Sequence, residues 1–176
     1  MPDPTPPRQI LVACYSLSGH TRRLALELSR ACNADVEMIG DMADRSGWIG
    51  QLRSAVQAFF HLQPAIRPSR SNPRDYALVV VCTPVWAWNM ASPMRSWLLR
   101  HRADIRRVAC VCTCRRSGHE KVLADLALLC GRPALAKMAL TTDRIEQKTH
   151  RRRVQGFASR LCDAVQMPRP SQQDAA

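Results

Sequence analysis

The sequence lacks several features that would assign its class directly. No apolar run approaches the roughly 20 residues that a membrane-spanning helix needs. The opening residues, MPDPTPP, contain neither the basic nor the apolar part of a signal peptide. The complete glycine patterns of the Walker and Rossmann phosphate loops are also absent. We therefore expect a cytoplasmic protein without a membrane span.

The Cys-x-x-Cys pairs of common zinc sites are absent too, although the chain has eight cysteines. Cys110, Cys112 and Cys114 alternate within an apolar run, so their side chains would share one face of a strand. That arrangement could bind a soft metal, but cysteine in an apolar run usually behaves as a small hydrophobic residue. We predict no metal site, and nothing points to the oxidising compartment in which disulfides form.

Acidic residues are scarce, with 14 against 26 basic residues and a net charge of +12. The densest basic clusters lie at 100–107 and 150–153. Such charge could attract nucleic acid or an anionic substrate. However, no zinc-finger or RNA-binding signature accompanies these clusters, and no aromatic residues are interleaved with them. We interpret them as solvated helix faces and do not expect nucleic acid as a partner.

The 176 residues form an alternating pattern of apolar strands and amphipathic helices, at a length typical of one domain. This alternation predicts an α/β protein, with a parallel sheet covered by helices on both faces. The expected strands are 10–15, 35–39, 76–82, 108–113 and 134–140, and the expected helices are 23–30, 94–102, 120–130 and 145–165.

Domain boundaries follow from composition. We expect residues 1–8 to be a disordered lead-in, 9–166 to form a single domain and 167–176 to be a disordered tail. The segment 41–73 is longer than a plain crossover, and its part 48–60 has helical periodicity. Three roles remain open for this insertion: it could cover the sheet, act as a lid or form a homodimer contact.

The first strand runs directly into a loop of serines and a glycine, followed by a helix. Unpaired N–H groups at the start of a helix, the helix dipole and hydroxyl donors together favour an anion. Gly19 would let the backbone approach that anion closely. The alternative is an ordinary turn in which Ser or Thr caps the helix.

The segment after the third strand carries two tryptophans, Trp86 and Trp88. It should lie at the carboxyl edge of the sheet, where ligands bind in such folds. Indole rings there suit an aromatic ligand, although either ring could instead pack into the core. Together the two segments favour a ligand that is aromatic at one end and phosphorylated at the other.

Both segments resemble motifs of the flavodoxin family. Residues 15–25 (YSLSGHTRRLA) resemble the short phosphate loop Y-S-x-[ST]-G-x-T-x-x-x-A, and residues 83–95 (TPVWAWNMASPMR) resemble the flavin loop T-P-V-[WY]-A-x-x-x-x-x-P-x-R. The resemblance extends over about 9–165. It implies a flavodoxin-like, doubly wound, three-layer α/β/α fold, with a five-stranded sheet in the order 2-1-3-4-5 and bound FMN.

The resemblance also implies roles for individual residues. The phosphate would be held by Ser16, Ser18, Gly19, His20 and Thr21, with Arg22 adding charge. The isoalloxazine would be lined by Thr83, Pro84, Val85, Trp86, Ala87 and Trp88, with Trp86 favoured for stacking and Asn89 at a flavin edge.

The third loop, 113–119 (TCRRSGH), departs from the Ser- or Gly-rich turn that is common in the family. Arg115 or Arg116 could place positive charge near N1 and O2 of the flavin and stabilise its anionic reduced form. Either arginine could equally obstruct the pocket or face solvent.

The sequence contains no convincing catalytic dyad, so the chemistry would belong to the flavin. A strongly basic chain suits the phosphates of NAD(P)H or an acidic partner. We expect an FMN-dependent NAD(P)H oxidoreductase that reduces a quinone, a flavin or another small acceptor. The alternatives are a one-electron carrier serving an acidic redox protein, and a flavin-free interaction module with the same fold.

Overall fold

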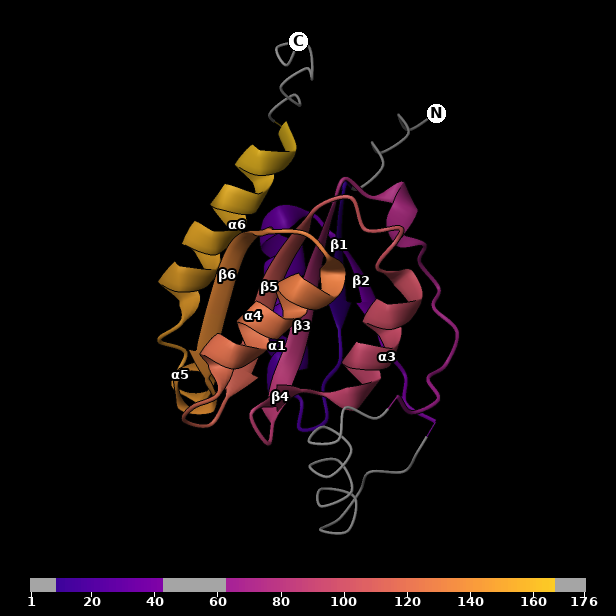
Figure 1. The fold of residues 1–176 in the computed structure, drawn as a ribbon. Coiled ribbons are helices and arrows are strands. Elements are labelled where there is room, and N and C mark those ends of the chain that lie inside the picture. Colours follow the sequence, from indigo (N-terminus) through magenta and orange to yellow (C-terminus); the bar gives the residue numbers. More distant parts are fainter. Residues whose placement is uncertain (1–8, 43–62, 167–176) are drawn as a thin grey trace.

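Continuous apolar runs form the centre of the sheet, as expected for parallel strands covered on both faces. The computed structural model describes residues 9–42 and 63–166. Five parallel strands follow one another in the order β2-β1-β3-β5-β6, which confirms the predicted topology (Figure 1). They are β1 (Ile10–Cys14), β2 (Asp35–Met38), β3 (Leu78–Trp86), β5 (Val108–Cys114) and β6 (Ala134–Thr141).

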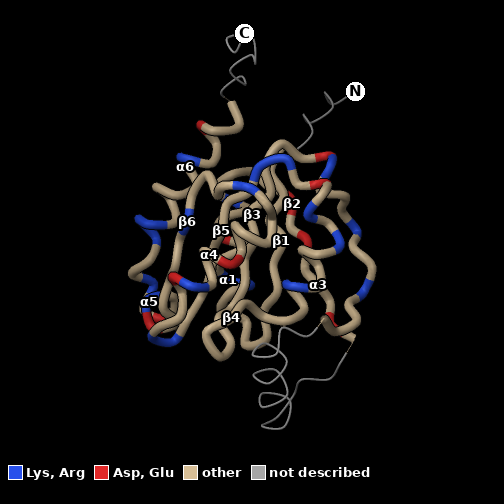
Figure 2. The backbone as a smooth tube through the Cα atoms, viewed as in Figure 1, with Lys and Arg blue, Asp and Glu red and all other residues tan. Residues whose placement is uncertain are grey.

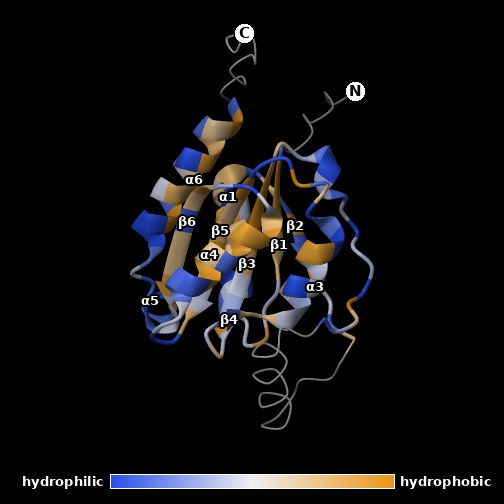
Figure 3. Cartoon of the chain, viewed as in Figure 1, coloured by the Kyte–Doolittle hydropathy of each residue, from blue (hydrophilic) through white to orange (hydrophobic). Residues whose placement is uncertain are grey.

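Helices cover both faces of this sheet (Figure 1). Alternate side chains of β1 enter two different cores: Leu11 and Ala13 face one, and Val12 and Cys14 face the other. Figure 3 shows the apolar strands at the centre and hydrophilic residues on the outer helix faces. One face carries α1 (His20–Cys32) and α6 (Arg151–Gln166), and the other carries α3 (Ser92–His101) and α4 (His119–Cys130).

The third strand is longer than the sequence indicated. We expected a strand over 76–82 and a loop from Thr83 onward, but β3 continues to Trp86. Thr83 and Pro84 still pair with β5, and the chain then reverses into the short antiparallel β4 (Asn89–Met90). The first four residues of the second motif are therefore strand, so their positions are fixed by the sheet.

The prediction of a single helix over 145–165 is wrong. The chain forms α5 (Thr142–Glu146) and then α6, which begins at Arg151. Between them Lys148 has a left-handed φ of 59°, which interrupts the helical path. The predicted apolar stripe of the last helix is confirmed, and its four residues are buried: Val154, Phe157, Ala158 and Leu161.

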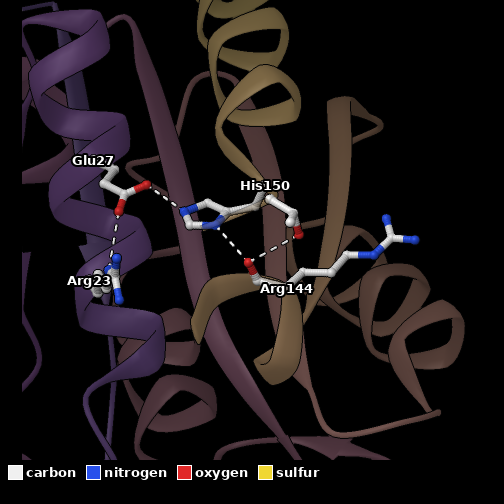
Figure 4. A network of polar contacts seen from close by, with 5 residues as sticks. Arg23, Glu27, Arg144 and His150 are labelled. Carbon is white, nitrogen blue, oxygen red and sulfur yellow. Dashed lines mark hydrogen bonds and ion pairs between the residues drawn. The ribbon is translucent and has the colours of Figure 1, made fainter. Parts of the chain in front are cut away.

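A buried polar network holds this break in place (Figure 4). The Nε2 atom of His150 lies 2.6 Å from Glu27 on α1, and its Nδ1 atom lies 3.0 Å from the carbonyl oxygen of Arg144. Both ring nitrogens face acceptor oxygens, so the two bonds need two ring protons or a proton on Glu27. Arg23 donates to the other oxygen of Glu27 at 3.3 Å. The network joins α1 to the α5–α6 connection.

The return segment 63–75 is fastened to β2 and α3 by partly buried polar contacts. The carboxylate of Glu37 accepts the N–H groups of Arg70 and Ser71 at 3.1 Å each. The buried Trp97 donates from Nε1 to Ser69 Oγ at 2.8 Å. A short 3-10 helix, Pro73–Asp75, then leads into β3.

Some predictions fall outside the described part of the chain. These are the lead-in 1–8, the tail 167–176 and the helix predicted over 48–60. Within 9–42 and 63–166, no helix has both the length and the apolar character needed to cross a bilayer.

Candidate functional site

Three loops meet at the carboxyl edge of the sheet, because β1, β3 and β5 run parallel. They are the β1–α1 loop (15–19), the turn between β3 and β4 (87–88) and the β5–α4 loop (115–118). The topology thus brings the two sequence motifs and the arginine-bearing third loop to the same edge. In Figure 1 this edge is at the bottom of the molecule, next to β4.

The β1–α1 loop presents the free start of a helix. Gly19 has a φ of 91°, a conformation that favours glycine, and no side chain caps α1. The N–H of Gly19 donates to Ser16 Oγ at 3.2 Å. The N–H groups of His20 and Thr21 have no acceptor within the helix, because they belong to its first turn. This arrangement can bind an anion through backbone donors and the helix dipole.

Two predicted phosphate residues are held by other parts of the protein. Thr21 is buried, and its hydroxyl lies 2.7 Å from the hydroxyl of Thr113 at the end of β5. The Nε2 atom of His20 lies 2.9 Å from the Glu146 carboxylate on α5, and its Nδ1 atom lies 2.9 Å from Ser18 Oγ. The Glu146 carboxylate can only accept in this pair, so Nε2 is the donor. These side chains brace the loop, which leaves its backbone N–H groups as the principal anion donors.

The turn after β3 is tight. Val85 pairs with Met90 and Trp86 pairs with Asn89, so Ala87 and Trp88 form a two-residue hairpin loop. Their φ angles of 45° and 58° correspond to a type I′ turn. Non-glycine residues adopt this conformation at a cost, and such strain is common at functional sites.

Asn89 fixes this turn. Its Nδ2 atom donates to the carbonyl of Ala87 at 2.9 Å, and its Oδ1 atom accepts from Lys121 at 2.7 Å. Thr83 is equally committed: it is buried, it accepts from the N–H of Ala91 and it donates to the carbonyl of Pro84, both at 3.1 Å. The side chains of Asn89 and Thr83 therefore both shape the hairpin.

The two indoles have different environments. Trp86 is half-buried, and its ring meets that of Tyr15 edge to face, with centroids 5.4 Å apart and planes at 89°. Trp88 is 63% exposed at the tip of the turn. Trp88 is therefore better placed to cover a ligand, although the sequence favoured Trp86.

The third loop packs against the same hairpin. Gly118 has a φ of 90°, and a Cβ there would lie 3.0 Å from the Trp88 ring and 3.1 Å from Val85. Only a residue without a side chain allows this close approach. Arg115 and Arg116, on the same loop, are exposed.

The hairpin and the third loop line an open cleft of about 700 Å³. Its size falls within the range of about 300–1,000 Å³ that is usual for small-molecule sites. The cleft combines an exposed indole with two guanidinium groups, which suits an aromatic, anionic ligand. Its lining residues are Val85, Ala87, Trp88, Arg115, Arg116, Ser117 and Asp143.

Asp143 was missed by the sequence analysis. It lies in the first turn of α5, and α5 begins before the helix that we expected from residue 145. The signal was present as the Thr-Thr-Asp run at 141–143, since such residues favour helix starts.

The alternating cysteines lie within the protein. Cys110 and Cys112 contribute to the core beneath α4, and Cys114 is also buried. Burial raises the pKa of Cys110 and Cys112 to about 12, so both remain thiols at neutral pH. No cluster of three metal-ligating side chains occurs in the described ranges.

The comparisons with known proteins show the fold. No protein-family profile and no curated protein matches the sequence. Among solved structures, a flavoprotein from Lactobacillus acidophilus in complex with FMN has a TM-score of 0.66 and 17% identity, over 81% of this chain and 98% of its own. A Bacteroides eggerthii protein, provisionally described as a flavoprotein, has a TM-score of 0.68 and 22% identity, over 85% and 98%. An archaeal flavodoxin has a TM-score of 0.54 and 14% identity, over 90% and 99%.

These neighbours establish a flavodoxin-like fold for the chain, as the two motifs predicted. The ligands of the neighbours belong to those proteins.

Proposed function

We propose that this protein binds FMN at the carboxyl edge of its sheet and acts as an NAD(P)H-dependent oxidoreductase for a quinone, a flavin or another small acceptor. The observation that carries the proposal is the cleft in which Trp88 lies with Arg115 and Arg116. The free start of α1 lies at the same edge of the sheet. An FMN-binding structural neighbour supports the choice of ligand.

The donor set of this edge fits FMN. Ser16, Gly19 and the first turn of α1 would hold the phosphate, mainly through backbone N–H groups and the helix dipole. A Cβ at Gly19 would meet no atom within 4 Å, so the loop is open on this side. Val85 and Trp88 would cover the aromatic ring system, because they line the cleft at its apolar side.

Bound FMN would supply the redox chemistry, accepting electrons from a nicotinamide donor and passing them to the acceptor. The protein's residues would set its position and environment. A guanidinium of Arg115 or Arg116 in the cleft would stabilise negative charge on the ring system. The indole of Trp88 would exclude water from one side of the cleft.

Charge favours a reductase over a one-electron carrier. The chain carries a net charge of +12, and both long side chains of the cleft's third loop are arginines. A basic rim attracts the phosphates of a nicotinamide dinucleotide and steers anions toward the site. An acidic redox protein remains the alternative partner, because it would use the same attraction.

The first experiment measures flavin binding. Titration of the purified full chain with FMN, followed by flavin fluorescence, should give saturable binding, and riboflavin should bind at least ten-fold more weakly because it lacks the phosphate. The complex should then oxidise NADPH or NADH in the presence of a soluble quinone. Failure to bind FMN would contradict the whole proposal. Binding without nicotinamide oxidation would leave the carrier as the remaining redox function.

A further inference from the structure

The eight cysteines divide by accessibility. Six of them are buried, whereas Cys32 and Cys162 are partly exposed. These two are far apart in the sequence, but they belong to adjacent helices on one face of the sheet, α1 and α6 (Figure 1). Leu28 of α1 and Leu161 of α6 contribute to the same apolar core. The two thiols that solvent can reach are thus on neighbouring elements.

Cys32 and Cys162 are also in contact. The Cys32 thiol donates to the carbonyl oxygen of Ala158 at 3.8 Å, and Ala158 lies one helical turn before Cys162. Cys162 is close enough to Cys32 to raise the pKa of the Cys32 thiol. Cys32 lies at the end of α1 and packs, together with Val165 of α6, against the apolar core of this face.

Burial lowers the reactivity of the Cys32 thiol. Burial, together with the neighbouring Cys162, raises the pKa of Cys32 to about 12, so the Cys32 thiol stays protonated at neutral pH. A protonated thiol is a poor nucleophile toward an oxidant. Cys32 therefore suits the second step of an oxidation that begins at the neighbouring Cys162.

We propose that Cys32 and Cys162 form a reversible intramolecular disulfide when the protein meets hydrogen peroxide. The sulfur of Cys162 attacks the peroxide, so that the O–O bond breaks, a sulfenic acid forms and one water leaves. The sulfur of Cys32 then attacks that of Cys162, its proton leaves with the hydroxyl group, and a second water is released. Overall, two thiols are oxidised and one peroxide is reduced to two waters. A dithiol reductant reverses the bond.

The disulfide would join the end of α1 to α6. The two residues are about 130 positions apart in the sequence, so the bond would remove much of the unfolded chain's freedom. The helices already contact each other at this point. We expect oxidation to raise the thermal unfolding midpoint by about 5–15 °C.

The test exposes the reduced full chain to a small excess of hydrogen peroxide. The intact mass should fall by two hydrogen atoms. Without reduction, a tryptic digest should link peptide 31–45 to peptide 161–176, each of which contains one cysteine. Dithiothreitol should restore the original mass and unfolding midpoint.

Matched variants complete the test. Cys32→Ala and Cys162→Ala should each abolish the mass loss and the rise in the midpoint. Cys130→Ala, which alters a buried cysteine of α4, should retain both. The proposal is overturned if the wild-type mass does not fall, if another pair of peptides is linked, or if the bond forms between two chains. None of these outcomes depends on bound FMN.

Discussion

At the scale of single residues, the second motif combines side chains with separate tasks. Asn89 and Thr83 form hydrogen bonds that shape the hairpin, whereas Trp88 is exposed over the cleft. The sequence could place all of them at the carboxyl edge, because the motif follows an apolar strand. It could not distinguish ligand-facing from turn-fixing groups, since that depends on the partners that the fold supplies, such as Lys121 for Asn89.

The choice between the two indoles follows from the same hairpin. A type I′ turn places Trp88 at the tip, whereas Trp86, still in the strand, meets Tyr15. We predict that Trp88→Ala weakens FMN binding by about ten-fold or more, because the ligand loses an aromatic face. Trp86→Ala should weaken it less. Fluorescence titration of both variants measures the difference.

Controls separate stacking from folding in this comparison. Trp88→Phe should restore most of the affinity, because it keeps an aromatic face. Trp86→Ala should lower the unfolding midpoint more than Trp88→Ala does, since the half-buried ring packs against the core. If Trp86→Ala loses more affinity than Trp88→Ala while the fold stays intact, Trp86 and not Trp88 stacks on the flavin.

At the scale of elements, the sequence predicted the strands better than the last helix. Long apolar runs such as those of β1 and β5 specify buried parallel strands directly. The break between α5 and α6 has no glycine or proline to mark it. It depends on Lys148 in a left-handed conformation and on the burial of His150 against α1, which are tertiary effects.

The His150 network should therefore contribute measurably to stability. Glu27→Ala removes the acceptor at 2.6 Å and leaves a buried ring nitrogen without its partner. We predict a loss of about 1–3 kcal/mol in the free energy of unfolding, the usual cost of an unsatisfied buried polar group. Urea unfolding followed by circular dichroism measures it.

Arg23→Ala provides the matched control for that measurement. It removes the other contact of Glu27, but the arginine side chain is 40% exposed. Exposed ion pairs contribute about 0–1 kcal/mol, so this variant should be nearly neutral. Equal losses in the free energy of unfolding would mean that the buried Glu27–His150 contact stabilises the protein no more than the exposed Arg23–Glu27 pair does.

At the scale of the whole molecule, the order of strands and helices was predictable, because right-handed crossovers leave few arrangements for alternating elements. The distribution of charge over the molecule was less predictable from the sequence. The sequence has basic clusters, but only the fold places Arg115 and Arg116 in the cleft. Figure 2 shows further basic residues along α6. The fold thus brings part of the net charge of +12 to the cleft.

This charge predicts a salt-dependent reaction. If the cleft arginines attract NADPH, its kcat/KM should fall by about three- to ten-fold when the ionic strength rises from about 0.05 to 0.5 M, because salt screens the attraction. NADH, which has fewer negative charges, should lose less. Arg115→Gln should flatten the salt dependence. Arg106→Gln, an exposed change just before β5 and hence at the opposite edge of the sheet, should preserve it. An unchanged rate across this range would mean that the basic cleft does not select the electron donor.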